Sequence, residues 1–277
     1  MRSILCVLVV AMVAVSCSSG RTYPSRTFTW SGDVTPGTTV NVRNLDGSIA
    51  IVPAADGKLS VDAVIVNAAP KAVEVKQATI GNDVYFCTLF QPKAGDTCGP
   101  AGHKHDVSIS PFSFFNRRHT NTVRYTLHVP SNVTVDVETV NGKIAAQNID
   151  GNVKATTVNG EIAVSTTKGT VNAETVNGSI IASMASLPDS GDVHLETVNG
   201  SITSVLPEGI GGSIDLENTN GTITTNYPNA VPDSADKHHL RIKLDDGNRR
   251  VRLETVNGSL NLTRYVKTAL VSLMSQE

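Results

Sequence analysis

The chain has 277 residues, a formal net charge of −2 and only 4% aromatic residues. The nearly balanced charge gives no electrostatic basis for nucleic-acid binding, and we expect no nucleic-acid partner. Few large side chains, with abundant Val, Thr, Ile, Asn and Gly in the second half, favour stacked β-strands over a helical bundle.

The N-terminus has the features of a bacterial export signal. Arg2 supplies a short basic start, and the stretch from Ile4 to Val15 is almost wholly apolar. About 12 apolar residues are too few to span a bilayer and are typical of a signal peptide. The sequence therefore predicts a signal peptide at residues 1–16 and export from the cytoplasm.

The signal ends in Ala14-Val15-Ser16-Cys17, which resembles a bacterial lipobox. In that interpretation Cys17 is the lipidated first residue of the mature protein, and residues 17–27 form a flexible tether. The lipid would then anchor the chain to a membrane of the cell envelope, at the outer membrane or in the periplasm. Ordinary cleavage before Cys17 fits the same residues.

Residues 28–130 are predicted to form an irregular N-terminal β region that caps the repeats after it. Within it, Asn44-Leu-Asp-Gly-Ser-Ile49 followed by Gly57-Lys-Leu-Ser-Val61 resembles one degenerate repeat. Runs of β-branched and aromatic residues predict further strands. These strands are expected at residues 61–66, 72–75, 84–90 and 122–129.

Two cysteines, Cys87 and Cys98, lie beyond the signal segment and the lipobox. An even pair in an oxidising compartment predicts a disulfide, which would stabilise the fold by about 2–3 kcal/mol. The alternatives are free thiols or a metal site with His103 and His105. The spacing of these four residues is not a standard zinc spacing, so we expect no metal and no cofactor.

The stretch 91–120 is expected to be a long loop and a region of partner contact, because it concentrates aromatic and basic residues. Exposed clusters of this kind suit contact with a protein, a sugar or a membrane. The alternative is a loop that folds back to plug the end of the core. The candidate contact residues are Phe112, Phe114, Phe115, Arg117 and Arg118.

The second half of the chain is built on a recurring Thr-Val-Asn-Gly unit. It has five exact copies and one variant, Asn218-Thr-Asn-Gly221, and the glycines of these six units are separated by 18, 18, 22, 21 and 37 residues. Alternation of apolar and polar residues after each glycine predicts half-buried strands, and Asn-Gly is expected to supply a positive-φ bend. The repeat turns are Asn141, Gly142, Asn159, Gly160, Asn177, Gly178, Asn199, Gly200, Asn220, Gly221, Asn257 and Gly258.

Two architectures satisfy this repeat. In a parallel β-solenoid each unit of 18–22 residues is one coil, and stacking buries an apolar face that no coil can bury alone. In an antiparallel meander each Asn-Gly is a hairpin turn. Only alternate bends carry Asn-Gly, which favours the parallel solenoid over the meander. We therefore expect an all-β parallel solenoid that spans residues 131–265, with the Asn side chains hydrogen-bonded in a ladder.

Two insertions are expected to interrupt the solenoid at bends. Residues 184–190 lengthen one coil, and residues 225–249 lengthen the last, before residues 251–262 supply the final repeat. Loops that project from a rigid stack are common places of binding. Residues 266–277 form a C-terminal tail that suits either a closing strand or a short helix.

The run from Tyr125 to Pro130 into Val135–Gly142, followed by repeated Asn-Gly-x-Ile, resembles the bacterial putative adhesin family, a domain of unknown function. The resemblance covers residues 28–265, and the lipobox-like start fits it. It implies a β-helix-like fold at the cell envelope and brings no catalytic residues. The Cys87–Cys98 loop departs from the family's usual pattern.

The sequence has none of the common catalytic motifs that we sought, including Gly-x-Ser-x-Gly, His-Glu-x-x-His and a Walker loop. Glu instead recurs at one repeat position. Like charges about 4.8 Å apart repel one another, so this column is expected to face solvent, either as a track for cations or as a solvated edge. Its members are Glu138, Glu174, Glu196, Glu217 and Glu254.

The sequence therefore predicts a non-enzymatic, lipid-anchored envelope protein, an adhesin-like β-solenoid that acts as a binding or scaffolding module. Its expected partners are the membrane and an envelope protein or glycan. Two alternatives remain open: a carbohydrate-active β-helix enzyme, and an accessory protein of envelope stress or signalling.

Overall fold

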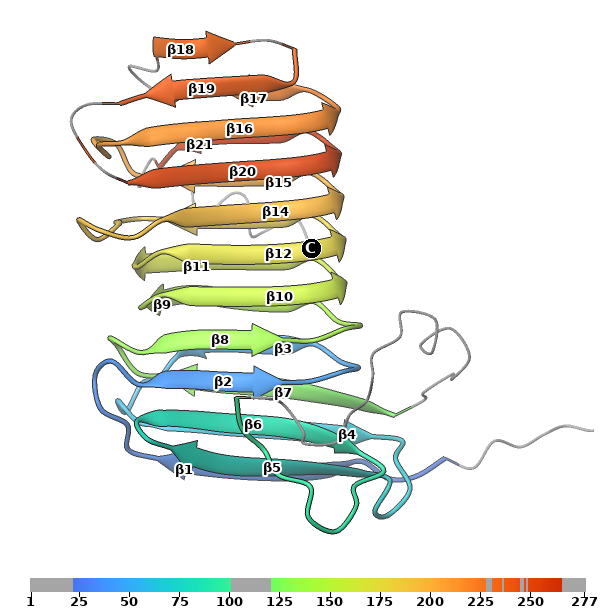
Figure 1. Cartoon of the computed structure of the whole chain (residues 1–277). Helices are drawn as coiled ribbons and strands as arrows, with labels where there is room; N and C mark the ends of the chain where they lie inside the picture. The colour runs from blue at the N-terminus through green and yellow to red at the C-terminus, as the bar shows by residue number, and fades with distance from the viewer. Residues whose placement is uncertain are drawn as a thin grey trace, which may run out of the picture.

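The computed structural model describes residues 22–100, 121–227, 231–235, 237–244, 247 and 249–265. These residues form an all-β fold of two mixed sheets, one of 10 strands and one of 11. The sheets lie face to face, and their strands stack along one axis (Figure 1). None of the described residues forms a helix, and so none forms a helix able to cross a membrane.

The strand order in each sheet differs from the order in the chain. The 10-stranded sheet consists, in spatial order, of β1 (Arg26–Gly32), β4 (Leu59–Val66), β7 (Thr122–Val129), β3 (Ile49–Pro53), β9 (Ile144–Asp150), β11 (Ile162–Lys168), β13 (Ile180–Met184), β15 (Ile202–Leu206), β21 (Leu260–Arg264) and β17 (Ile223–Thr225). The 11-stranded sheet consists of β18 (Val231–Ala235), β19 (His239–Lys243), β16 (Ser213–Asn220), β20 (Arg250–Asn257), β14 (Val193–Asn199), β12 (Val171–Asn177), β10 (Val153–Asn159), β8 (Thr134–Glu138), β2 (Thr39–Arg43), β6 (Asp83–Phe90) and β5 (Val73–Ile80).

Successive repeats pair in parallel and in register. β10 pairs with β12, which places Asn159 beside Asn177, and β12 pairs with β14, which places Asn177 beside Asn199. Each repeat supplies one strand to the 11-stranded sheet and, after its Asn-Gly bend, one strand to the 10-stranded sheet. We call such a pair of strands with its bend a level. Identical residues of neighbouring levels therefore lie in columns.

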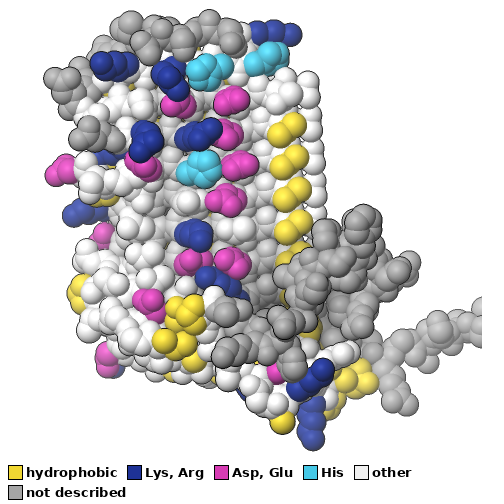
Figure 2. All heavy atoms as spheres, in the orientation of Figure 1, with side chains coloured by type: hydrophobic (Ala, Val, Ile, Leu, Met, Phe, Trp, Pro, Cys, Tyr) yellow, Lys and Arg dark blue, Asp and Glu magenta, His cyan; other side chains and the backbone are white. Residues whose placement is uncertain are grey.

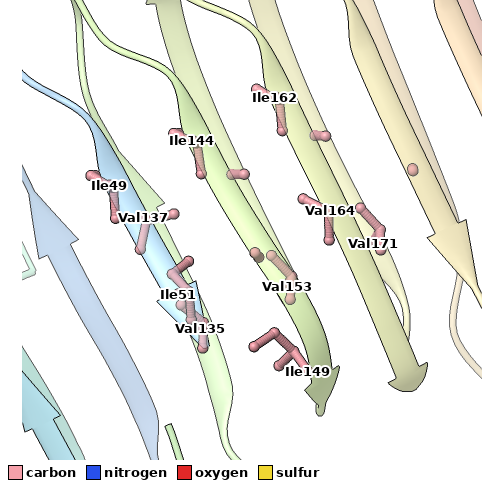
Figure 3. Packing of buried hydrophobic residues seen from close by; sticks show 14 of the residues in the cluster. Ile49, Ile51, Val135, Val137, Ile144, Ile149, Val153, Ile162, Val164 and Val171 are labelled. Atoms are coloured by element: carbon pink, nitrogen blue, oxygen red, sulfur yellow. The ribbon is translucent and has the colours of Figure 1, made fainter. Parts of the chain in front are cut away.

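Small β-branched and aliphatic side chains fill the space between the sheets. Ile144, Ile162 and Ile180 lie beside one another in β9, β11 and β13 and are fully buried. Figure 3 shows such residues of both sheets meeting between the ribbons. Burying a Val, Leu or Ile side chain contributes about 1.5–3 kcal/mol. The core is thin, but it continues through the stack.

The two ends of the stack contain antiparallel pairs, and those at the C-terminal end correct the expectation of a parallel solenoid throughout residues 131–265. At the N-terminal end, β4 pairs antiparallel with β1 and β7, and β5 pairs antiparallel with β6. At the other end, β19 pairs antiparallel with both β16 and β18. Only β5–β6 and β18–β19 are hairpins of consecutive strands, joined by the short connection that antiparallel neighbours allow. Together with the other antiparallel pairs they close the stack where the repeat stops.

The last repeat in the chain does not lie at the end of the stack. β20 pairs in parallel with β14 on one side and β16 on the other, and β21 lies between β15 and β17. The expectation that residues 225–249 only lengthen the last coil was wrong, because they contain β18 and β19. Similarly, β2 lies between β6 and β8, and β3 lies between β7 and β9.

Candidate functional site

The Thr of each Thr-Val-Asn-Gly unit has a structural task. The Thr157 hydroxyl donates to the carbonyl of Gly142 at 3.1 Å, and Thr175 donates to Gly160 at the same distance. Both acceptors belong to the neighbouring level. Both threonines are buried, and a buried hydroxyl needs such a partner. This position therefore fastens one level to the next.

The Asn side chains form a ladder along the edge of the stack. Asn159 Nδ2 donates to Asn141 Oδ1, and the same bond joins the later levels at 2.8–3.0 Å. At its N-terminal end, Asn141 donates to the carboxylate of Asp46 at 2.6 Å. The amide dipoles all point in one direction, and aligned hydrogen bonds of this kind strengthen one another. The Asn residues of the repeat turns therefore have a structural role: they join neighbouring levels.

The glycines of the Asn-Gly bends are needed for a different reason from the one expected. Among the six, only Gly221 has a positive φ, +147°; the expectation of a positive-φ bend was wrong for the other five. A Cβ atom on Gly178 would lie 2.0 Å from the carbonyl oxygen of Gly160. Glycine is required at these bends because the backbones of neighbouring levels approach too closely for a side chain.

The outer face of the 11-stranded sheet carries columns of side chains. Figure 2 shows a hydrophobic column beside a column of acidic residues and a mixed column that contains Lys, Arg and His. The Val residues of the repeat form the hydrophobic column, and Val158, Val176 and Val256 are 38–42% exposed. The register places Glu138, Glu174, Glu196, Glu254 and Glu217 at the acidic position.

Basic groups compensate part of this acidic column. Arg43 lies 3.5 Å from Glu138 and 3.0 Å from Asp136 of the mixed column, and Arg252 pairs with Glu254. These groups are at least partly exposed, so each pair contributes little stability. The face is a solvated and mostly balanced surface, which gives no reason to place a cation there.

A pocket of about 470 Å³ lies where three bends meet, on the side of the stack opposite the Asn ladder. The bends follow β13 and β15 and precede β20. The lining residues are Ala185, Ser186, Leu187, Asp189, Pro207, Glu208, Gly209, Ile210, Gly211, Gly247 and Arg249. The pocket therefore combines two carboxylates, one guanidinium and several backbone groups.

Arg249 is the central polar group of this pocket. Its guanidinium donates to the carbonyl of Pro188, which connects two of the three bends. Its Nε atom is buried and has no hydrogen-bond partner within the described part of the chain. A buried donor without a partner costs free energy, but this atom is closed to solvent, so it does not itself face a ligand in the pocket.

Tyr227 contacts the bend after β15, whose residues 207–211 line one side of the pocket. Its side chain is 5% exposed, and its hydroxyl donates to the carbonyl of Pro207. Burial is the main reason that the pKa of the Tyr227 phenol is raised, and the nearby carboxylate of Glu208 raises it further. The phenol therefore keeps its proton at neutral pH and holds the bend after β15.

The residues singled out in the sequence fall into two groups. Cys87 and Cys98 form a disulfide, with their Cα atoms 5.6 Å apart. No group of metal-ligating residues is found within the described ranges. The remaining candidates, Cys17, Phe112, Phe114, Phe115, Arg117 and Arg118, lie outside the described residues.

The sequence predicted partner contact in residues 91–120 and named the insertions as common places of binding, but it did not identify the pocket residues. Residues 184–190 were recognised as an insertion, and Asp189 lies in it. Nothing in the sequence indicates that Glu208 and Arg249 share its pocket. The only feature of the sequence that pointed to these residues was that the bends containing them interrupt the regular repeat.

Comparisons with known proteins found solved structures of low similarity. No family model and no curated protein matches the sequence. The crystal structure of a putative cell adhesion protein from Clostridium sporogenes is 13% identical, with a TM-score of 0.49, over 87% of this chain and 100% of that chain. A putative adhesin from Bacteroides fragilis is 9% identical, with a TM-score of 0.30, over 87% and 97%. At these values the function has to be argued from the site itself.

Proposed function

We propose that this protein is a non-enzymatic, adhesin-like binding module of the bacterial cell envelope, built as a parallel β-solenoid. Its ligand is a glycan, held in the pocket between the three bends. The carrying observation is a pocket whose lining brings Asp189, Glu208 and Arg249 together from three separate bends. The in-register stack supplies the rigid support for these bends.

The chemistry of the lining favours a sugar over an apolar ligand. Sugar hydroxyls both donate and accept hydrogen bonds, so they suit two carboxylates and a guanidinium together. The Glu208 carboxylate accepts a hydrogen bond from Arg264 at 2.8 Å; this pair is exposed and contributes little stability, so the rigidity of the pocket comes from the stacked strands beneath the bends. A preorganised polar site loses less free energy on binding than a flexible one.

Glycan binding to the purified protein tests the pocket. On an array of envelope and host glycans, the protein should bind at least one class, and Asp189→Asn should weaken that binding by at least about tenfold, because a charged hydrogen bond is lost. Glu174→Gln, in the acidic column on a different face, is the matched control and should bind normally. No bound glycan, or equal loss in both variants, would sink the proposal; glycan cleavage would favour the carbohydrate-active enzyme instead.

The proposal includes a lipid anchor at Cys17, supported by the sequence Ala14-Val15-Ser16-Cys17. Cells that express the full chain and are fed a labelled fatty acid should show labelled protein in the membrane fraction. Cys17→Ser should abolish the label and release the protein from the membrane fraction. Cys6→Ser, within the apolar stretch, is the control and should keep both. A label that survives Cys17→Ser contradicts the anchor.

A further inference from the structure

The six Asn-Gly bends share one chemical liability but have different surroundings. In an Asn-Gly pair the glycine nitrogen can attack the Asn side-chain carbonyl carbon, because no Cβ atom obstructs the approach. The reaction needs a free glycine N–H and an Asn side chain that can rotate. Hydrogen bonds to either group must break first, so bonding in the fold decides the rate at each bend.

At five of the six bends, both the glycine N–H and the Asn side chain are hydrogen-bonded. The Gly178 N–H donates to the backbone carbonyl of Asn199 at 3.0 Å. The Asn177 side chain donates to Asn159 at 2.8 Å and accepts from Asn199 at 2.9 Å. The corresponding glycine bonds of 2.9–3.0 Å are made by Gly142, Gly160, Gly200 and Gly258. The corresponding two-sided side-chain bonds are made by Asn141, Asn159, Asn199 and Asn257.

The bend at Asn220 and Gly221 is the exception, because it lies in the last level of the column. Asn220 donates Nδ2 to Asn257 Oδ1 at 3.0 Å. Neither its own Oδ1 nor the Gly221 N–H has a hydrogen-bond partner among the residues that the structure describes. Gly221 is exposed, whereas the five other glycines are half-buried. The next strand, β19, is antiparallel and adds no further Asn to the ladder.

We propose that Asn220 is the site at which the folded protein deamidates spontaneously, ahead of the other five Asn-Gly bends. The Gly221 nitrogen gives its proton to solvent base and bonds to Asn220 Cγ; the Cγ–Nδ2 bond then breaks, and the side-chain nitrogen takes a proton from solvent and leaves as ammonia. Water then opens the succinimide ring to aspartate or isoaspartate. The new carboxylate cannot donate to Asn257 Oδ1, so the ladder loses its last hydrogen bond.

Peptide mass spectrometry of the ageing full-length protein tests this order. Cleavage after Glu places Asn177, Asn199, Asn220 and Asn257 in separate peptides, because a Glu lies between each neighbouring pair. At mildly alkaline pH the Asn220 peptide should convert at least about tenfold faster than the other three, because their bends must first break additional hydrogen bonds. The conversion is read from the mass gain and from the separate elution of the isoaspartyl form.

The same measurement in concentrated urea is the control. All six bends then lose their hydrogen bonds, and their rates should converge, because each retains the same Asn-Gly pair. Asn220 converting no faster than Asn177 in the folded protein would overturn the proposal. A rate advantage of Asn220 that persists in urea would overturn it too, because the cause would then lie in the local sequence.

Discussion

Replacing Gly178 with alanine is expected to lower the free energy of unfolding by about 3 kcal/mol or more, the upper range for overpacking. The added Cβ would lie 2.0 Å from the carbonyl oxygen of Gly160 and 2.6 Å from its carbonyl carbon. Both are backbone atoms of the neighbouring level, so no side chain can rotate away. Relief requires the two levels to separate, which weakens the bond from Thr175 to that same carbonyl. Urea unfolding of both proteins measures the difference.

Gly209→Ala is the matched control for this prediction. Gly209 has a φ of +71°, and a Cβ there meets nothing within 4 Å. Its substitution should cost only the left-handed backbone conformation, roughly 1–2 kcal/mol. Equal losses in the two variants would show that the close stacking of the Asn-Gly bends is not what requires glycine.

Leu253→Asp is expected to detach the C-terminal end of the stack. Leu253 in β20 is fully buried and lies between Leu195 of β14 and Leu216 of β16. A buried carboxylate without a partner costs several kcal/mol. Because β16 and β17 reach the rest of the stack through β20 and β21, we expect all four strands to lose protection in hydrogen exchange. In a stack of nearest-neighbour levels, β10 to β13 should stay protected.

Val256→Asp is the control on the same strand. Val256 is 42% exposed, so its new charge stays in water, and protection should remain as in the unchanged protein. Two outcomes would contradict the inserted position of the last repeat. One is loss of protection in β20 and β21 alone; the other is uniform loss over the whole stack.

The sequence was most informative where the signal is local. The alternation of apolar and polar residues after each repeat glycine predicted the strands that begin at Ile144, Ile162 and Ile180. A strand pattern depends only on which residues face inward, so a short window is enough. The ladder was also predictable, because parallel stacking of one repeat must bring equal residues together.

The sequence could not determine which level stacks on which. The unit that ends at Gly258 resembles the one that ends at Gly200, so its residues fit between any two similar levels. Only the pairing of β20 with both β14 and β16 shows where it lies. The same pairing brings the bend with Arg249 beside the bends after β13 and β15 and so creates the pocket.

For this protein, the sequence by itself determined the strands of the repeat, their period and the positions of the bends, because these depend on neighbouring residues. The tertiary structure decided the antiparallel ends, the place of the last repeat and the group around Arg249. These features arise from contacts between segments far apart in the chain. It also gave the reason for the repeat glycines, since the approach of Gly178 to Gly160 exists only after stacking.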